Sequence, residues 1–304
     1  MLAPAVLATL GRVAKPAQPV EFAPGRPLEL PGRGTTCVID LPGPPGAPAV
    51  ILVHALATTA ALSWYPSMSR LSEHFRVVAF DQRWHGRGIR SEEFRLADCA
   101  DDVVAVADAL GIDRFTVVGY SMGGAIAQLV WKRHRRRVEG LVLGATSRNF
   151  CGTPAERLWF WLTTLAMTRL GSRARLGMER LAARLSDEPT PLSAELAQLG
   201  PWAFSEFRST SIWSMFAAID EIGRFDSSAW IRQVDVPASV IVATRDRLIP
   251  TRRQRRLAAA IPGAMSFDIE GAHTALVLGA DEFVPALVEA CLSISRRIQR
   301  RAAA

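Results

Sequence analysis

Runs of consecutive apolar residues alternate with helical patterns along most of this chain. The apolar runs cover residues 49–54, 76–80, 116–118, 141–143 and 240–243. Unbroken apolar runs are typical of strands that are buried on both faces of a parallel sheet. The helical patterns between them cover residues 66–74, 96–110, 125–136 and 252–261. This alternation predicts an α/β fold with a doubly wound, mostly parallel sheet, in which ligands bind at the carboxyl ends of the strands.

The alternation stops between about residues 146 and 234, where the sequence is helical in pattern and rich in tryptophan. A helical insertion at this point would lie over the strand ends as a cap. We expect most of its aromatic side chains to form the cap's own core, with one or two facing a substrate cavity, because small-molecule pockets are mostly apolar and aromatic. The tryptophans concerned are Trp159, Trp161, Trp202, Trp213 and Trp230.

The 304 residues, 49% of them hydrophobic, suit one α/β domain with an inserted subdomain. The predicted parts are an N-terminal extension, a core in two segments, the helical cap and a short tail: 1–27, 28–145 with 235–300, 146–234 and 301–304. The first ten residues are apolar but lack the features of a signal peptide, and no segment reaches the ~20 apolar residues of a membrane span. A helix packed on the domain is favoured over an interfacial anchor.

The net charge is +7, and arginine supplies almost all of the positive charge. Its densest runs are residues 132–137, 252–256 and 296–301, of which the first and last fall near predicted helix C-termini, where cations complement the helix dipole. No nucleic-acid-binding module accompanies them, so we expect no nucleic-acid partner and leave weak membrane attraction as the alternative. Four scattered cysteines predict neither a disulfide framework nor a metal cluster, and favour the cytoplasm.

The stretch Gly119-Tyr120-Ser121-Met122-Gly123 matches the G-x-S-x-G nucleophile elbow. A β-branched and aromatic strand pattern precedes it, and a helical pattern follows it. The glycines leave room for a sharp strand-to-helix turn, which would lift the Ser121 hydroxyl above the sheet at a helix N-terminus. The other interpretation of the motif alone is a tight connection without catalysis.

A serine nucleophile needs a base within hydrogen-bond reach, and the base needs an orienting carboxylate. Of the five histidines, His273 lies in a G-x-H loop that follows a predicted strand over residues 265–269. Asp246 follows the preceding strand, so the order Ser121, Asp246, His273 is the one expected of a Ser–His–Asp hydrolase on this type of sheet. Taken separately, Asp246 could cap a helix or pair with a neighbouring arginine, and His273 could be a core histidine. His54 and His85 also follow strands, whereas His74 and His134 fall at helix ends.

From about Leu28 to Ile298 the chain resembles the α/β-hydrolase superfamily. The similarity is to its cap-bearing branch of esterases, lipases, metal-free haloperoxidases, carbon–carbon bond hydrolases and epoxide hydrolases. The resemblance implies that Ser121 is the nucleophile, Asp246 the acid and His273 the base. A mechanism with these three residues needs no metal or organic cofactor, and the spacing of residues implies none. Epoxide hydrolases and haloalkane dehalogenases carry aspartate at the elbow, so the serine argues against an alkyl-enzyme ester.

Two further segments resemble loops of the family. His54-Ala55-Leu56 matches the H-G-x sequence after the third strand, which implies an oxyanion hole formed by the backbone N–H groups of Leu56 and Met122. Residues 81–88 resemble the D-x-R-G-H-G-x-S loop, whose role is chiefly structural, so His85 is not expected to be catalytic. Ala55 and Trp84 replace family glycines. The Ala55 side chain is therefore expected to affect the oxyanion loop, and Trp84 to fill part of the pocket or to pack under the cap.

These features predict a serine hydrolase that cleaves a carboxylic ester or thioester with a hydrophobic acyl or aromatic group. A carbon–carbon bond hydrolase or an acyltransferase of the same fold is one alternative, and a non-catalytic ligand-binding protein on the same scaffold is another. The expected partner is a small, hydrophobic, ester-like substrate. The candidate substrate contacts are Trp84, Tyr120 and Trp159.

Overall fold

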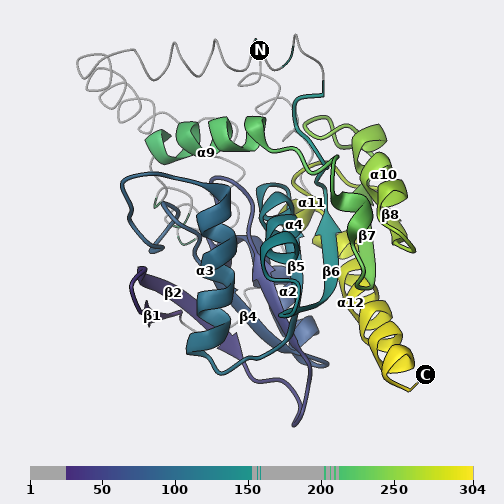
Figure 1. Cartoon of the computed structure of the whole chain (residues 1–304), viewed down its shortest axis with the longest axis horizontal. Coiled ribbons are helices and arrows are strands. Elements are labelled where there is room, and N and C mark those ends of the chain that lie inside the picture. Colours follow the sequence, from purple (N-terminus) through teal and green to yellow (C-terminus); the bar gives the residue numbers. More distant parts are fainter. Residues whose placement is uncertain are drawn as a thin grey trace.

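The computed structural model describes residues 25–152, 156, 158, 202, 206, 209 and 212–303. Its centre is one eight-stranded sheet in the order β1-β2-β4-β3-β5-β6-β7-β8, in which β1 and β2 are antiparallel to their neighbours and all other pairs are parallel (Figure 1). The strands are β1 (Arg26–Leu30), β2 (Gly34–Leu41), β3 (Ala49–Val53), β4 (Arg76–Phe80), β5 (Phe115–Tyr120), β6 (Val138–Gly144), β7 (Ala238–Ala243) and β8 (Met265–Ile269).

Helices cover both faces of this sheet, as the doubly wound fold requires. The helices are α2 (Ala60–Ser72), α3 (Leu96–Ala109), α4 (Met122–Arg133), α9 (Ile212–Arg224), α10 (Thr251–Ala260), α11 (Ala275–Leu278) and α12 (Ala280–Ala302), with a 3-10 turn over Ile231–Gln233. One buried apolar cluster joins α3, α4 and α10 to the sheet, and a second joins α2, α11 and α12 to the other face. The predicted fold class is confirmed.

Side-chain alternation along β5 shows how an unbroken apolar run builds two cores at once. Phe115 and Val117 belong to the cluster under α3 and α4, whereas Val118 and Tyr120 belong to the cluster under α2 and α12. Successive residues of a strand point to opposite faces, so a central strand must be apolar throughout. This is the physical reason for the runs seen in the sequence.

The helix predicted over residues 66–74 begins six residues earlier, at Ala60, and ends at Ser72. Thr59 caps α2, because its Oγ1 accepts a hydrogen bond from the Leu62 N–H at 3.1 Å. Pro66 therefore lies inside the helix and not at its start, although proline there removes one backbone hydrogen bond. The buried side chains of Trp64 and Leu71 lie on this helix, and their packing offsets that loss.

Within the predicted cap, the structure describes one helix, α9. The Glu221 side chain of α9 accepts a hydrogen bond from the Leu96 N–H at the start of α3. Figure 1 shows α9 across the end of α3. Two of the five tryptophans contact helices of the α/β core. Trp230 stacks on Trp131 of α4, and Trp202 packs edge-on against Tyr65 of α2. Trp159, Trp161 and the Trp213 side chain lie outside the described residues, as do residues 1–24, and the domain boundaries stay predictions.

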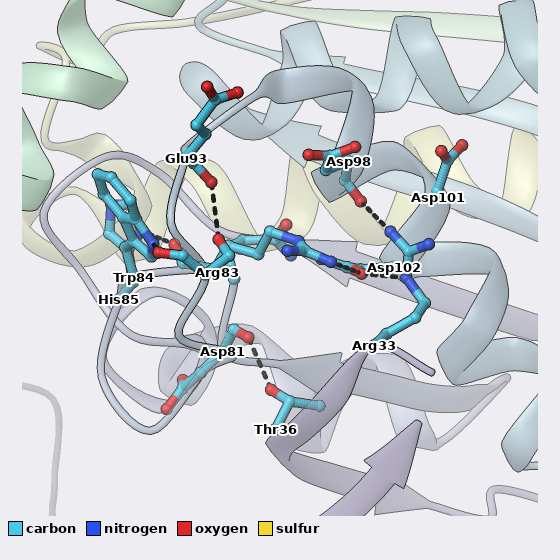
Figure 2. A network of polar contacts seen from close by, with 12 residues as sticks. Arg33, Thr36, Asp81, Arg83, Trp84, His85, Glu93, Asp98, Asp101 and Asp102 are labelled. Atoms are coloured by element: carbon cyan, nitrogen blue, oxygen red, sulfur yellow. Dashed lines mark hydrogen bonds and ion pairs between the residues drawn. The ribbon is translucent and has the colours of Figure 1, made fainter. Parts of the chain in front are cut away.

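A buried ionic network ties the β1–β2 hairpin to α3 (Figure 2). Asp102 of α3 accepts hydrogen bonds from Arg83, at 2.5 and 2.9 Å, and from Arg33 of the hairpin, at 2.5 Å. Arg33 also donates to the Asp98 carbonyl oxygen at 3.0 Å. Two cations therefore share one buried carboxylate, which joins three segments that are distant in sequence.

The hydropathy of the helices and the burial of the cysteines are two further features of the described residues. No helix among them is long and apolar enough to cross a bilayer. All four cysteines are buried, on β2, α3, α12 and the segment after β6, and burial raises the thiol pKa of three of them: Cys37, Cys99 and Cys291.

Candidate active site

Ser121 lies in a left-handed backbone conformation between β5 and α4, with φ 54° and ψ −116°. The chain reverses here from strand to helix within one residue, and the neighbouring glycines permit it. A Cβ atom on Gly119 would lie 2.1 Å from the Gly123 carbonyl oxygen, and one on Gly123 would lie 2.0 Å from the Val53 carbonyl oxygen. The elbow therefore packs backbone on backbone, which holds the hydroxyl of Ser121 at the carboxyl end of the sheet.

His273 and Asp246 come from the loops after β8 and β7 and meet Ser121 at this end of the sheet. The His273 Nε2 lies 2.9 Å from the Ser121 Oγ, and its Nδ1 lies 2.8 Å from the Asp246 Oδ2. A carboxylate only accepts, so Nδ1 carries the proton and Nε2 is free to take one from the serine. The structure thus brings together the three residues that the sequence order singled out.

The Asp246 carboxylate is buried and accepts four hydrogen bonds. Its Oδ1 accepts from the backbone N–H groups of Leu248 and Ile249, at 2.8 and 2.9 Å. Its Oδ2 accepts from His273 and from the Gln254 Nε2, at 3.0 Å. Asp246 does not pair with the adjacent Arg245, because Arg245 forms an ion pair with Glu270.

Tyr120 precedes the serine and lies beneath the site. Its hydroxyl donates to the His273 carbonyl oxygen at 2.9 Å, and its ring packs edge-on against Phe283. Only 2% of the residue is exposed. The ring belongs to the core cluster on the α2 and α12 side, and contact between Tyr120 and substrate stays a prediction.

The loop that carries Leu56 is held by its own polar groups. The Ala55 carbonyl oxygen accepts from the His54 Nδ1 at 2.7 Å and from the Thr58 hydroxyl at 2.9 Å. The left-handed residue of this loop is Ala57, with φ 64°, so the Cβ of Ala55 is not at the strained position. Leu56 is partly buried in this loop, and Met122 is buried as the first residue of α4. Their roles as oxyanion donors stay predictions.

Trp84 occupies a left-handed position, with φ 63°, where the family has glycine. Its indole N–H donates to the Ser91 carbonyl oxygen at 2.9 Å, and its ring packs against Phe94. These contacts offset the conformational strain of a large side chain at a positive φ angle. Contact between Trp84 and substrate stays a prediction, and Trp159 lies outside the described residues.

Two further histidines lie behind the site as neutral core residues. Burial lowers the pKa of His54 from 6.5 to about 4 and that of His85 to about 3. The His54 Nε2 accepts from the Gln82 N–H at 2.8 Å, and the His85 Nδ1 donates to the Arg83 carbonyl oxygen at 2.8 Å. His134 pairs with Asp101 at 2.7 Å on the surface of α3 and α4, and His74 is exposed before β4.

Sequence reasoning did not find Gln254. It lies eight residues after Asp246 on α10, and the arginine-rich pattern around it gives no sign that its side chain is the buried one. Among the described residues, no group of three or more His, Cys, Asp or Glu side chains is arranged to hold a metal ion. The groups that the described site brings together are the Ser121 hydroxyl, the His273 imidazole and the Asp246 carboxylate, joined by hydrogen bonds.

Comparison with known proteins gives the class to which this fold and site belong. The model of the alpha/beta hydrolase fold family matches residues 48–280. A protein of Agrobacterium fabrum named "Putative carbamate hydrolase RutD" is 27% identical over 251 residues, which cover 80% of this chain and 92% of that protein. The crystal structure of the enol-lactonase from Burkholderia xenovorans LB400 has a TM-score of 0.68 at 24% identity and covers 88% of this chain and all of that one.

A local match is also present. The 3-oxoadipate enol-lactonase 1 of Acinetobacter baylyi is 35% identical over 95 residues, which are 31% of this chain and 35% of that enzyme. The chain belongs to the α/β-hydrolase family. It is a hydrolase of the α/β fold, as its similarity to named hydrolases supports.

Proposed function

We propose that this protein hydrolyses a carboxylic ester or thioester through an acyl-enzyme on Ser121. The observation that carries the proposal is a pair of hydrogen bonds on the His273 imidazole. Its Nε2 lies 2.9 Å from the Ser121 Oγ, and its Nδ1 lies 2.8 Å from the Asp246 Oδ2. A serine hydroxyl becomes nucleophilic when a positioned base takes its proton during attack.

In the first half of the reaction, the Ser121 Oγ attacks the substrate carbonyl carbon while the His273 Nε2 takes its proton. Backbone N–H groups of Leu56 and Met122 would bind the oxyanion, and each such donor contributes about 10²–10³ in rate. The tetrahedral intermediate collapses, the bond to the alcohol or thiol breaks, and the proton on Nε2 passes to the leaving group. Asp246 stabilises the charged imidazole while it exists.

In the second half, water replaces the leaving group. The His273 Nε2 takes a proton from the water as its oxygen attacks the acyl carbon. The ester bond to Ser121 then breaks, the proton returns to the serine oxygen, and the carboxylic acid departs. The chemistry consumes one water and uses only this chain's own residues.

Carbamates are a second candidate substrate class. The similarity to the Agrobacterium protein named for carbamate hydrolysis spans 80% of this chain. A carbamate presents the same type of carbonyl to the serine and differs in its nitrogen substituent. The local match to the enol-lactonase of Acinetobacter baylyi is the similarity that favours the ester, because a lactone is a cyclic ester. For location, the buried thiols of Cys37, Cys99 and Cys291 suit a reducing compartment, so we infer the cytoplasm.

Fluorophosphonate labelling read by intact mass tests the nucleophile. We expect one adduct on the wild-type protein, no adduct on Ser121→Ala, and an adduct on the control Ser147→Ala, whose buried serine follows the neighbouring strand β6. An adduct that persists in folded Ser121→Ala would overturn the assignment. A chain-length series of p-nitrophenyl esters, with matched p-nitrophenyl carbamates, then decides between the two substrate classes.

A further inference from the structure

Gln254 is a fully buried side chain of α10 that reaches the carboxylate of Asp246. Its Nε2 lies 3.0 Å from the Asp246 Oδ2 and 2.7 Å from the Ile249 carbonyl oxygen, and its Oε1 accepts from the Ala243 N–H at 3.0 Å. The amide orientation is fixed by these partners, because a carbonyl oxygen must face a donor and an N–H must face an acceptor.

The contact falls on the oxygen that also holds the base. The Asp246 Oδ2 accepts from both Gln254 and His273, and Oδ1 accepts from two backbone N–H groups. A carboxylate offers about four lone-pair sites. All are used, so the group is fixed against rotation about its Cβ–Cγ bond. Among the residues that the structure describes, Gln254 is the one side chain besides His273 that takes part.

We propose that Gln254 is a positioning residue that fixes the plane of the Asp246 carboxylate and shares its Oδ2 with His273. This inference rests on the proposed function of the triad. A donor on Oδ2 withdraws part of the negative charge that Asp246 would otherwise present to the imidazole. The amide therefore limits how strongly Asp246 holds a proton on His273, so the imidazole stays neutral, and able to act as a base, at lower pH.

The other titratable groups near this pair do not replace the amide. Tyr120 contacts the His273 carbonyl oxygen, and burial raises its pKa far above the usual value, so it stays neutral. Arg245 and Glu270 form an exposed ion pair on the loops that carry Asp246 and His273, and Arg247 is exposed beside Asp246. Gln254 is the buried neutral donor among them.

The test compares Gln254→Leu with the wild-type protein in the pH dependence of kcat/KM on a p-nitrophenyl ester. We expect kcat to fall about tenfold, KM to change by less than about twofold, and the acidic limb of the profile to move to higher pH. A loss of packing alone would lower the amount of folded enzyme without moving that limb. An unmoved limb in Gln254→Leu would overturn the proposal.

Gln128→Leu is the matched control. Gln128 is also a fully buried glutamine, and its amide binds the Gly124 and Ser147 carbonyl oxygens and the Ser227 hydroxyl without reaching Asp246. We expect this variant to lose stability and to keep the wild-type acidic limb. A shift of the same size in both variants would overturn the proposal.

Gln254→Met serves if the leucine variant does not fold. It keeps the length of the buried side chain and removes the amide donor from the Asp246 Oδ2. The acidic limb should move to higher pH as in Gln254→Leu, and no movement would contradict the proposal. NMR titration of the His273 ring in the same proteins gives this result without turnover, so a failure of the proposed function is distinguished from a failure of the positioning role.

Discussion

The Tyr120 hydroxyl donates a hydrogen bond to the main-chain carbonyl oxygen of His273, 2.9 Å away across 153 residues of sequence. Tyr120 ends β5, the strand that delivers the nucleophile, and His273 lies in the loop between β8 and α11. The base is thus held at two points, its ring by Asp246 and its backbone by the residue next to the nucleophile. The distance between serine and imidazole is therefore set by one rigid strand.

Removing this hydroxyl tests the link. In Tyr120→Phe the ring still packs against Phe283, but the His273 carbonyl oxygen loses its partner, so stability should fall by about 1 kcal/mol. We expect kcat to fall roughly tenfold with little change in KM, because the loop gains freedom to misplace the imidazole. Steady-state kinetics and urea denaturation measure the two effects, and a wild-type kcat in the variant would show that the loop is fixed elsewhere.

Asp246→Asn should leave the fold in place and remove most of the activity. The two backbone N–H groups would keep the asparagine oxygen in the Oδ1 position, which turns the NH₂ group toward His273 and Gln254. The imidazole would then present its lone pair on Nδ1 and its proton to the serine, which is the wrong tautomer for a base. We expect kcat to fall by about 10³–10⁴. Asp268→Asn, at an exposed carboxylate, is the control and should keep full activity.

The neutral histidines His54 and His85 make stability depend on pH. Both have a lowered pKa when folded, about 4 and about 3, against 6.5 when exposed. Below pH 6.5 the unfolded chain binds protons that the folded protein does not. The contribution of these histidines to the free energy of unfolding is therefore fully present above that pH. It is lost as the pH drops toward 4, by up to about 1.4 kcal/mol per pH unit for each histidine. The raised pKa of Asp81 acts in the opposite direction.

His85→Asn isolates one of these contributions. Asparagine keeps a donor for the Arg83 carbonyl oxygen and cannot take up a proton in this range. Urea denaturation at pH 7, 6 and 5 gives the free energy of unfolding, whose loss between pH 7 and 5 should be smaller in the variant than in the wild type by about 1 kcal/mol per pH unit. Equal losses in the two proteins would mean that His85 is protonated in the fold.

Asp102→Ala tests the buried network of Figure 2. The change leaves Arg83 and Arg33 without their shared carboxylate, and Arg83 is almost fully enclosed. Removing one partner of a buried ion pair costs about 3–5 kcal/mol, and the partial exposure of Arg33 favours the lower end of that range. The exposed pair of Arg255 and Asp268 is the comparison, since Asp268→Ala should cost less than about 1 kcal/mol. Similar losses in both variants would show that the network contributes little.

The strand runs and the elbow could be read from the sequence because they depend on local rules. A strand buried on both faces must be apolar throughout, and a strand that turns into a helix around Ser121 needs the glycines that flank it. The order of Ser121, Asp246 and His273 along the chain then placed each at the end of a strand. These features need no knowledge of which segments pack against one another.

The features that sequence reasoning missed depend on tertiary contacts. Nothing near Gln254 in the sequence shows that α10 turns this one polar side chain toward Asp246. Trp230 resembled a cap residue by its position in the chain, but its partner is Trp131 on α4. Trp84 holds a glycine-like conformation because Phe94 and the Ser91 carbonyl oxygen stabilise its ring. In each case a distant contact overrides the local preference.

The reactivity of the four buried cysteines can be used to measure local opening of the fold. They lie on β2, α3, α12 and the segment after β6, so each reports on a different part of the fold. A buried thiol reacts with a water-soluble disulfide reagent only while its surroundings are open, and the rate measures the free energy of that opening. The native chain can thus be mapped region by region without introducing a label, and a cysteine added at the surface would be the fast-reacting thiol.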